Sequence, residues 1–370
     1  MKLSELDYNL PPERIAQYPL DERDASRMLL LDRASGAWED RQFRELPEVL
    51  RGNELIVLNN ARVLPARLFG RRAGLRAQSP GRNNPRASNF LPSFIEVLLV
   101  RQLAPQDWEA LVRPGRKVPV GERIIFGPHE KKEDQGELEA IVEGRGEYGL
   151  RVLHFSSKNG LHEALARLGH VPLPPYIKRS GEPMDRERYQ TVYARQGSAV
   201  AAPTAGLHFT AEILTRLRQR GIEIAEITLE VGLGTFEPVR TERIEDHPIH
   251  KEAYEISKAA AAAISQAMRE ERPVLAVGTT VVRALEDAAE RFSARGETIA
   301  PIEAEAEILI YPGKPFRIVS QLLTNFHLPR SSLLAMVAAF AGRERILDAY
   351  RHAVESQYRF YSYGDCMLIR

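Results

Sequence analysis

Two kinds of hydrophobic periodicity divide the chain. From Ala201 onward, short apolar runs typical of strands alternate with segments whose apolar residues recur at the spacing of one helix face. Thr210 can cap one helix that stops at Gly221, and Ser257 can cap another. The pattern predicts helices over 211–220, 258–270 and 280–292, two more after Pro329 separated by Gly342, and strands over 222–231, 273–277, 306–311 and 318–326.

Between these segments and the N-terminal part lies a stretch with only the strand period. Short runs in which apolar and polar residues alternate are separated by Gly and Pro turn signals such as Pro114-Gly115 and Gly121. Short strands at such regular spacing are typical of a sandwich or barrel. The predicted strands are 95–101, 107–113, 122–126, 137–143 and 150–155.

The two periodicities together predict the fold class. Alternating strands and helices indicate a layered α/β domain, and the all-β stretch interrupts it as an inserted, barrel-like domain. We place the α/β domain at residues 1–62 and 156–370 and the inserted domain at 63–155. Residues 73–93 are rich in Gly, Pro, Ser, Asn and Arg without periodicity, which predicts a flexible loop.

Composition narrows the class of protein. Of the 370 residues, 44% are hydrophobic and 27% charged, the balance of a folded globular chain rather than a disordered one. The only cysteine, Cys366, excludes an internal disulfide and is expected to be buried. An acidic N-terminus and a longest apolar run of only 333–341 predict a cytoplasmic protein that is neither secreted nor membrane-embedded.

The distribution of charge along the chain is compatible with a local nucleic-acid-binding surface. The chain has 51 basic and 50 acidic residues, a balance that argues against non-specific coating of nucleic acid. Residues 55–95, however, contain no Asp or Glu and seven arginines.

Candidate chemistry gathers where predicted strands end, the place where open α/β sheets bind ligands. The segment AAPTAGLHFT at 201–210 carries Gly206 and His208; Gly278-Thr279-Thr280 leads from a strand into a helix start that can hold an anion; TNFHLP carries His327. Each segment also has a purely structural explanation. The two histidine segments can be capped turns in which the imidazole only makes hydrogen bonds within the fold, and Gly278-Thr279-Thr280 can be an ordinary helix N-cap. Familiar signatures are absent: VGLGTF (Gly232, Gly234) lacks a third glycine, and no GxSxG is present.

Taken together, several long segments resemble one family. VPLPPYI (171–177), AAPTAGLHFT, TLEVGLGTFEPV (228–239), IEDHPIHKE (244–252), AVGTTVVRALE (276–286), TNFHLPRSSLL (324–334), YRFYSYGDCML (358–368) and LNNARVLPARLFGR (58–71) are similar to the S-adenosylmethionine:tRNA ribosyltransferase-isomerases. The chain departs from the family pattern at Glu230, where histidine is frequent, at Ala61, where threonine is common, and in a longer 73–93 segment.

The resemblance implies a function in queuosine biosynthesis. Such an enzyme would transfer the ribosyl part of S-adenosylmethionine to 7-aminomethyl-7-deazaguanine at the tRNA wobble position, isomerise it to the epoxide, and release adenine and methionine. It also implies an α/β domain with an inserted barrel. S-adenosylmethionine would be the ribosyl donor, with no metal or further cofactor, and tRNA would bind through its anticodon loop. We expect a monomer.

This chemistry requires a base at the 5′ carbon beside the sulfonium and an acid for the leaving adenine. We expect His208, His327, Asp246, His247 and Glu230 to transfer protons. The expected substrate-binding residues are Thr204, Gly206, Phe209, Gly232, Gly234, Phe236, Gly278, Thr279, Thr280, Phe326 and Tyr363, and the expected tRNA-binding residues are Arg62, Arg67, Arg71, Arg72, Arg113, Arg116 and Lys117.

Two other functions stay open from the residues. An RNA methyltransferase would also use S-adenosylmethionine but would yield S-adenosylhomocysteine. A non-catalytic RNA-binding module would bind without consuming S-adenosylmethionine, although such modules depend on basic and stacking surfaces rather than on His, Thr and Gly at strand ends.

Overall fold

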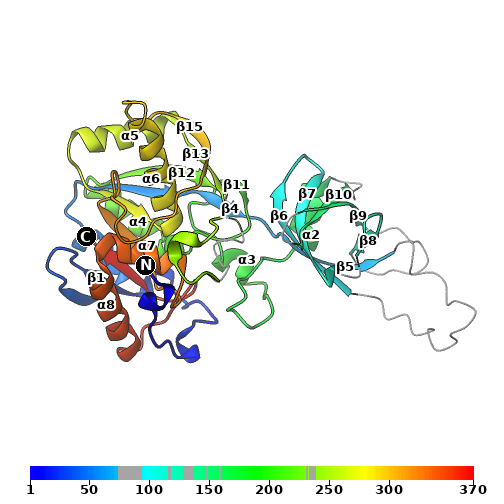
Figure 1. Cartoon of the computed structure of the whole chain (residues 1–370), viewed down its shortest axis with the longest axis horizontal. Helices are drawn as coiled ribbons and strands as arrows, with labels where there is room; N and C mark the ends of the chain where they lie inside the picture. Colours follow the sequence, from blue (N-terminus) through cyan, green and yellow to red (C-terminus); the bar gives the residue numbers. More distant parts are fainter. Residues whose placement is uncertain are drawn as a thin grey trace, which may run out of the picture. The chain divides into compact units, whose positions relative to one another are not determined.

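The computed structural model describes residues 1–73, 94–115, 118–127, 137–146, 149–157, 160–230, 232 and 239–370. These residues form two compact units (Figure 1). The first comprises Met1–Arg62, Pro174–Ser180 and Glu187–Arg370, and the second comprises Val63–Leu173 and Gly181–Arg186. The predicted loop 73–93, apart from Ala73, lies outside the described residues.

A nine-stranded mixed sheet in the order β15-β13-β12-β3-β14-β16-β17-β1-β2 organises the first unit. Its centre is parallel, since β3 pairs with both β12 and β14, and β14 pairs with β16 in the same direction. The strands are β1 (Arg27–Leu31), β2 (Trp38–Gln42), β3 (Leu55–Asn59), β12 (Glu223–Leu229), β13 (Glu252–Ile256), β14 (Val274–Val277), β15 (Ile302–Ala306), β16 (Gln321–Asn325) and β17 (Cys366–Ile369).

Apolar side chains cover both faces of this sheet. Successive residues of β3 point to opposite sides, so Leu55 and Val57 join one core while Ile56 and Leu58 join the other. Helices pack against both cores, which explains why the central strands are continuously apolar. The helices are α1 (Leu46–Val49), α4 (Ala211–Gln219), α5 (Lys258–Arg269), α6 (Thr279–Ser293), α7 (Ser332–Ala341) and α8 (Arg343–Glu355), while the short α3 (Asp185–Arg188) has two residues in each unit.

The second unit is a closed barrel of antiparallel strands in the order β10-β7-β6-β5-β8-β9. Gly70 has a packing reason, because a Cβ there would lie 2.7 Å from the ring of Phe126 on the neighbouring strand. The strands are β5 (Arg67–Arg72), β6 (Phe94–Gln102), β7 (Asp107–Arg113), β8 (Arg123–Phe126), β9 (Leu138–Arg145) and β10 (Arg151–Ser157). The layered α/β fold with an inserted barrel is therefore confirmed.

Local signals predicted the elements well. The hydroxyl oxygen of Thr210 accepts from Ile213 N at 3.1 Å, and that of Ser257 accepts from Ala260 N at 3.3 Å, so both predicted caps are confirmed. Gly342, at φ 92°, separates the two C-terminal helices. Cys366 is buried in β17, also as predicted.

One predicted strand is wrong, and several were missed. Residues 306–311 were expected to form a strand, but the strand is β15 (Ile302–Ala306), whose alternating IEAEA pairs with β13. The sequence pattern did not reveal β1, β2, β3, β5, β13 or β17. The second unit also continues past β10 to Leu173, because helix α2 (Leu161–Leu168) packs against that strand. No helix in the described part of the chain combines the length and apolar character needed to cross a membrane.

Candidate active site

A cavity of about 370 Å³ lies beyond the carboxyl ends of β14 and β16 in the first unit. Small-molecule sites in proteins typically occupy roughly 300–1,000 Å³, and open α/β sheets bind ligands at this edge. Five separate segments converge on it. Its wall is formed by Pro175, Tyr176, Ala202, Pro203, Thr204, Ala205, Gly278, Thr279, Thr280, Thr324, Asn325, Phe326, His327, Leu328, Pro329, Arg330, Ser331, Leu333, Tyr361 and Ser362.

The N-terminus of α6 forms one side of the cavity. Gly278 makes the turn from β14 into the helix. Its φ of 96° is a backbone conformation that residues other than glycine rarely adopt. Its amide donates to Leu323 O at 2.8 Å, which fixes the turn against β16. The first turn of α6 therefore presents backbone N–H groups without intrahelical partners beside Thr279 and Thr280, an arrangement suited to a carboxylate.

His327 also lines the cavity and is held by three neighbours. Its Nε2 is 2.8 Å from the hydroxyl oxygen of Thr324, its amide donates to the hydroxyl of Tyr350 at 3.1 Å, and its carbonyl accepts from the hydroxyl of Tyr8. Burial lowers the pKa of His327 to about 3. The ring is therefore neutral at pH 7, the state in which an imidazole accepts a proton.

Asn325 connects the cavity to His208. Its amide nitrogen lies 3.3 Å from His208 Nε2 and donates to Tyr361 O at 3.0 Å. Because that amide is a donor, Nε2 is the acceptor of the His208 ring, and Nδ1 carries the proton that reaches Ser26 Oγ at 2.9 Å. Burial, with smaller contributions from Arg359 and Arg23, lowers the pKa of His208 to about 3.

Two tyrosines complete the wall. Tyr361 has φ 71°, uncommon for a residue with a side chain, and its ring centroid lies 4.0 Å from that of Tyr176. The Tyr176 hydroxyl is 2.5 Å from Ser362 Oγ, which ties the 174–180 segment to the C-terminal loop. An aromatic surface of this kind can contact a purine ring or a sulfonium.

The structure brings six of the predicted substrate and proton-transfer residues together at this cavity: Thr204, Gly278, Thr279, Thr280, Phe326 and His327. His208 and Tyr363 line a separate hollow of about 20 Å³. His247 lines another, of about 30 Å³, which shares Thr280 and Leu333 with the main cavity.

Other predicted residues lie elsewhere. Phe209 is fully buried in the core against Phe43 and Tyr193. Gly206 does allow a close approach, but to Tyr193, whose hydroxyl would lie 2.1 Å from an added Cβ. Asp246 and Glu230 are exposed, Glu230 directly after β12, and Gly232 is partly exposed. Gly234, Phe236, Arg116 and Lys117 lie outside the described residues.

The predicted tRNA-binding arginines differ in their surroundings. Arg72 pairs with the buried Glu122 at 2.6 Å, and Arg67 lies 3.3 Å from Glu96, so both take part in barrel structure. Arg62 and Arg113 are exposed, and Arg71 is half-buried on β5.

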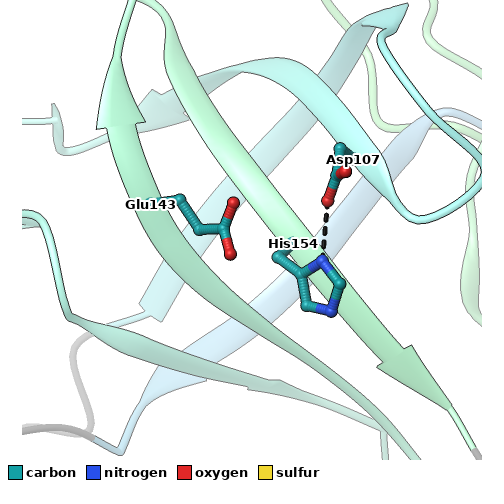
Figure 2. A group of neighbouring side chains, drawn as sticks. All are labelled: Asp107, Glu143 and His154. Atoms are coloured by element: carbon teal, nitrogen blue, oxygen red, sulfur yellow. Dashed lines mark hydrogen bonds and ion pairs between the residues drawn. The ribbon is translucent and has the colours of Figure 1, made fainter.

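One group among the described residues has the spacing of metal ligands (Figure 2). Asp107, Glu143 and His154, on three neighbouring barrel strands, have ligand atoms within 4.8 Å of one another. Glu143 is the extra residue of a β-bulge opposite β10, and its carboxylate points toward the other two. His154 Nδ1 is 2.6 Å from Asp107 Oδ1, a hydrogen bond that accounts for two of the three groups without an ion.

Sequence reasoning missed Tyr176, Thr324 and Asn325 at the cavity, and it gave no role to Tyr361 within the segment 358–368. Thr324 and Asn325 had a signal, since two polar residues end an otherwise apolar strand, and buried polar groups need partners. Tyr350, which positions His327, lies on α8 in a segment that showed only an amphipathic helix pattern.

The chain is similar to named proteins along its whole length. Residues 3–369 match a family described as queuosine biosynthesis protein. The chain is 53% identical to the S-adenosylmethionine:tRNA ribosyltransferase-isomerase of Solibacter usitatus and 51% identical to that of Moorella thermoacetica, with 100% of each chain covered. A crystal structure of S-adenosylmethionine tRNA ribosyltransferase from Thermotoga maritima is 34% identical, with a TM-score of 0.52 over 99% of this chain and 100% of that one.

Proposed function

The chain belongs to the queuosine biosynthesis protein family, and from that membership we propose that it is an S-adenosylmethionine:tRNA ribosyltransferase-isomerase whose active site is the cavity beyond β14 and β16. The observation that carries the site assignment is the convergence of Thr204, the α6 N-terminus and His327 on one cavity. The substrates are S-adenosylmethionine and tRNA carrying 7-aminomethyl-7-deazaguanine, and adenine and methionine leave.

S-adenosylmethionine binds in this cavity with its carboxylate at the α6 N-terminus. The unpaired amides of the first helical turn and the positive end of the helix favour an anion there. The hydroxyls of Thr279 and Thr280 lie at the same place and can donate to it. The aromatic pair Tyr176 and Tyr361 contacts the adenine or the sulfonium.

His327 transfers a proton during the reaction. The Thr324 hydroxyl donates to Asn325 O at 3.3 Å, so its oxygen can accept the Nε2 proton of His327. Nδ1 is then the basic nitrogen of the His327 ring. The backbone of this residue is fixed at its carbonyl by Tyr8 and at its amide by Tyr350. A base held in one tautomer can remove the proton from the carbon next to the sulfonium.

His208 acts through Asn325. The histidine does not line the main cavity, and both its ring nitrogens have partners, Ser26 and Asn325. Its accepting Nε2 orients the Asn325 amide, which also holds the Tyr361 carbonyl. We therefore assign His208 as a positioning residue and His327 as the catalytic one.

The decisive test is product analysis. The protein is incubated with S-adenosylmethionine and tRNA carrying the aminomethyl precursor, and released bases are measured. Adenine plus methionine supports the proposal, whereas S-adenosylhomocysteine would show a methyltransferase, and binding without consumption would show an RNA-binding module. If the folded protein releases no adenine, the proposed reaction is wrong.

Variants then separate the two histidines. His327→Gln should lower kcat by about 10²–10⁴-fold, the usual contribution of a proton-transfer group. Thr324→Val should lower kcat, because without the hydroxyl the His327 proton is no longer held on Nε2. Thr324→Ser keeps the hydroxyl and should keep kcat near the wild-type value. His208→Gln should cost less than His327→Gln; an equal or larger loss would reverse the two assignments.

Partners and location follow from the substrates. The exposed Arg62 and Arg113 are proposed to contact tRNA phosphates, together with Arg71. No metal or redox cofactor is needed by the proposed reaction. An enzyme that modifies tRNA on this donor is proposed to act in the cytoplasm, as a monomer.

A further inference from the structure

Three aromatic rings form an exposed row on the outer surface of the barrel. Phe94 on β6 is 64% exposed and Phe69 on β5 is 37% exposed, and their rings are stacked with centroids 5.3 Å apart and planes 24° from parallel. The ring of His170, also exposed, lies 5.1 Å from that of Phe69. We call Phe69, Phe94 and His170 the aromatic row.

The barrel does not need these rings for its core. Inward positions of the same strands are filled by fully buried residues, among them Leu68, Ile95 and Val97. Gly70 brings β5 close to Phe126 on β8, while Phe69, the residue before it, stays on the outside. A pair of stacked phenyl rings exposed to water is an apolar patch of the kind that marks a binding site.

The surroundings of the aromatic row are basic. Arg71 is the cross-strand partner of Phe94, and Arg67 forms a backbone bridge with His170. Burial, and then the charges of Arg186 and Arg67, lower the pKa of His170, so both guanidinium groups act on this ring. The acid opposite Phe69 in the register, Glu96, already pairs with Arg67 at 3.3 Å.

From these observations we propose that the aromatic row is a stacking platform for unpaired bases of the tRNA substrate, with the neighbouring arginines placed for its phosphates. Flat rings beside cationic side chains recognise single-stranded nucleic acid, because every base has a face to stack and every nucleotide a phosphate. The inference rests on the proposed function, which makes tRNA the partner, and adds the surface that holds it.

The test compares Phe94→Ala with Ile141→Ala. Ile141 is a matched control, because it is an apolar residue 45% exposed on β9 of the same barrel. Removal of one stacking ring should raise the KM for tRNA about 5- to 100-fold. The KM for S-adenosylmethionine and the kcat at saturating tRNA should stay unchanged, Phe94→Tyr should restore the KM, and Ile141→Ala should behave as wild type.

A binding assay keeps this inference separate from the proposed function. An anticodon stem–loop with 2-aminopurine in its loop should lose fluorescence on binding to the wild type and lose much less on binding to the Phe69→Ala/Phe94→Ala variant. If wild type and variant have equal tRNA KM and equal quenching, the platform is refuted while the enzyme activity stands. If the variant instead abolishes self-association and leaves tRNA binding unchanged, the aromatic row joins two copies of the chain and the proposal is wrong. Failure of the wild type to release adenine refutes the proposed reaction, while the quenching still decides the platform.

Discussion

Acid should destabilise the first unit through its two buried histidines. His208 and His327 have folded-state pKa values of about 3, against about 6.5 in an unfolded chain. When the folded pKa is lowered, unfolding takes up a proton at any pH between the two values. The stabilisation is therefore complete above pH 6.5 and is lost progressively as the pH falls toward 3.

The size of the effect follows from these two values. For one such histidine, the free energy of unfolding at pH 5 is about 2 kcal/mol lower than at pH 8, because the unfolded imidazole is almost fully protonated and the folded one is not. His208 and His327 together account for about 4 kcal/mol. A domain is typically stable by about 5–15 kcal/mol, so the loss is a large part of the whole.

The two tryptophans make the measurement specific. Trp38 belongs to the first unit and Trp108 to the second, so a Trp108→Phe chain reports unfolding of the first unit through Trp38 fluorescence. Urea unfolding is followed from pH 8 to pH 5 in this background. His208→Gln and His327→Gln should each remove about 2 kcal/mol of the fall in the free energy of unfolding between pH 8 and pH 5.

Labelled histidine side chains offer an independent check. In carbon-13 spectra of the folded protein, the imidazole signals of His208 and His327 should not titrate between pH 8 and pH 5, and each signal should disappear in the corresponding variant. Normal titration of either ring near pH 6.5, or an unchanged acid slope in both variants, would refute the assignment of buried neutral histidines.

Three further predictions test other contacts. Gly206→Ala should destabilise the chain by about 1–3 kcal/mol, and Tyr193→Phe should relieve this in the double variant, because it removes the hydroxyl that the new Cβ meets. Glu286→Ala should cost about 3 kcal/mol or more and Glu286→Gln less, since three backbone amides donate to this carboxylate. Arg72→Gln should lower barrel stability in urea unfolding, whereas Arg113→Gln should leave stability unchanged and lower the salt slope of tRNA binding by about 1.

Elements fixed by local chemistry were predictable, and those fixed by distant pairing were not. A capping oxygen at Thr210 or Ser257 acts within one helical turn, so the sequence alone located those helices. The strand β17 is different: it lies between β1 and β16, from opposite ends of the chain, and its four apolar residues could equally have continued a helix. The misplaced strand at 306–311 shows the same limit, because the apolar run ILIY is more strand-like than the paired IEAEA before it.

The candidate site could be located but not resolved into roles. Strand ends rich in Thr, Gly and His indicated the edge of the sheet at which the cavity lies, since parallel strands bring those ends together. The same rule made His208 and His327 equivalent, and burial, the first cause of both shifts, lowers the pKa of each to about 3. What separates them is Asn325. It donates its amide to His208 and thereby fills that ring's only acceptor, whereas His327 meets a hydroxyl that can take its proton and leave the other nitrogen basic. Two histidines whose pKa values are both lowered by burial can thus have unequal chemistry, and the difference is set by the partner that each ring nitrogen already has.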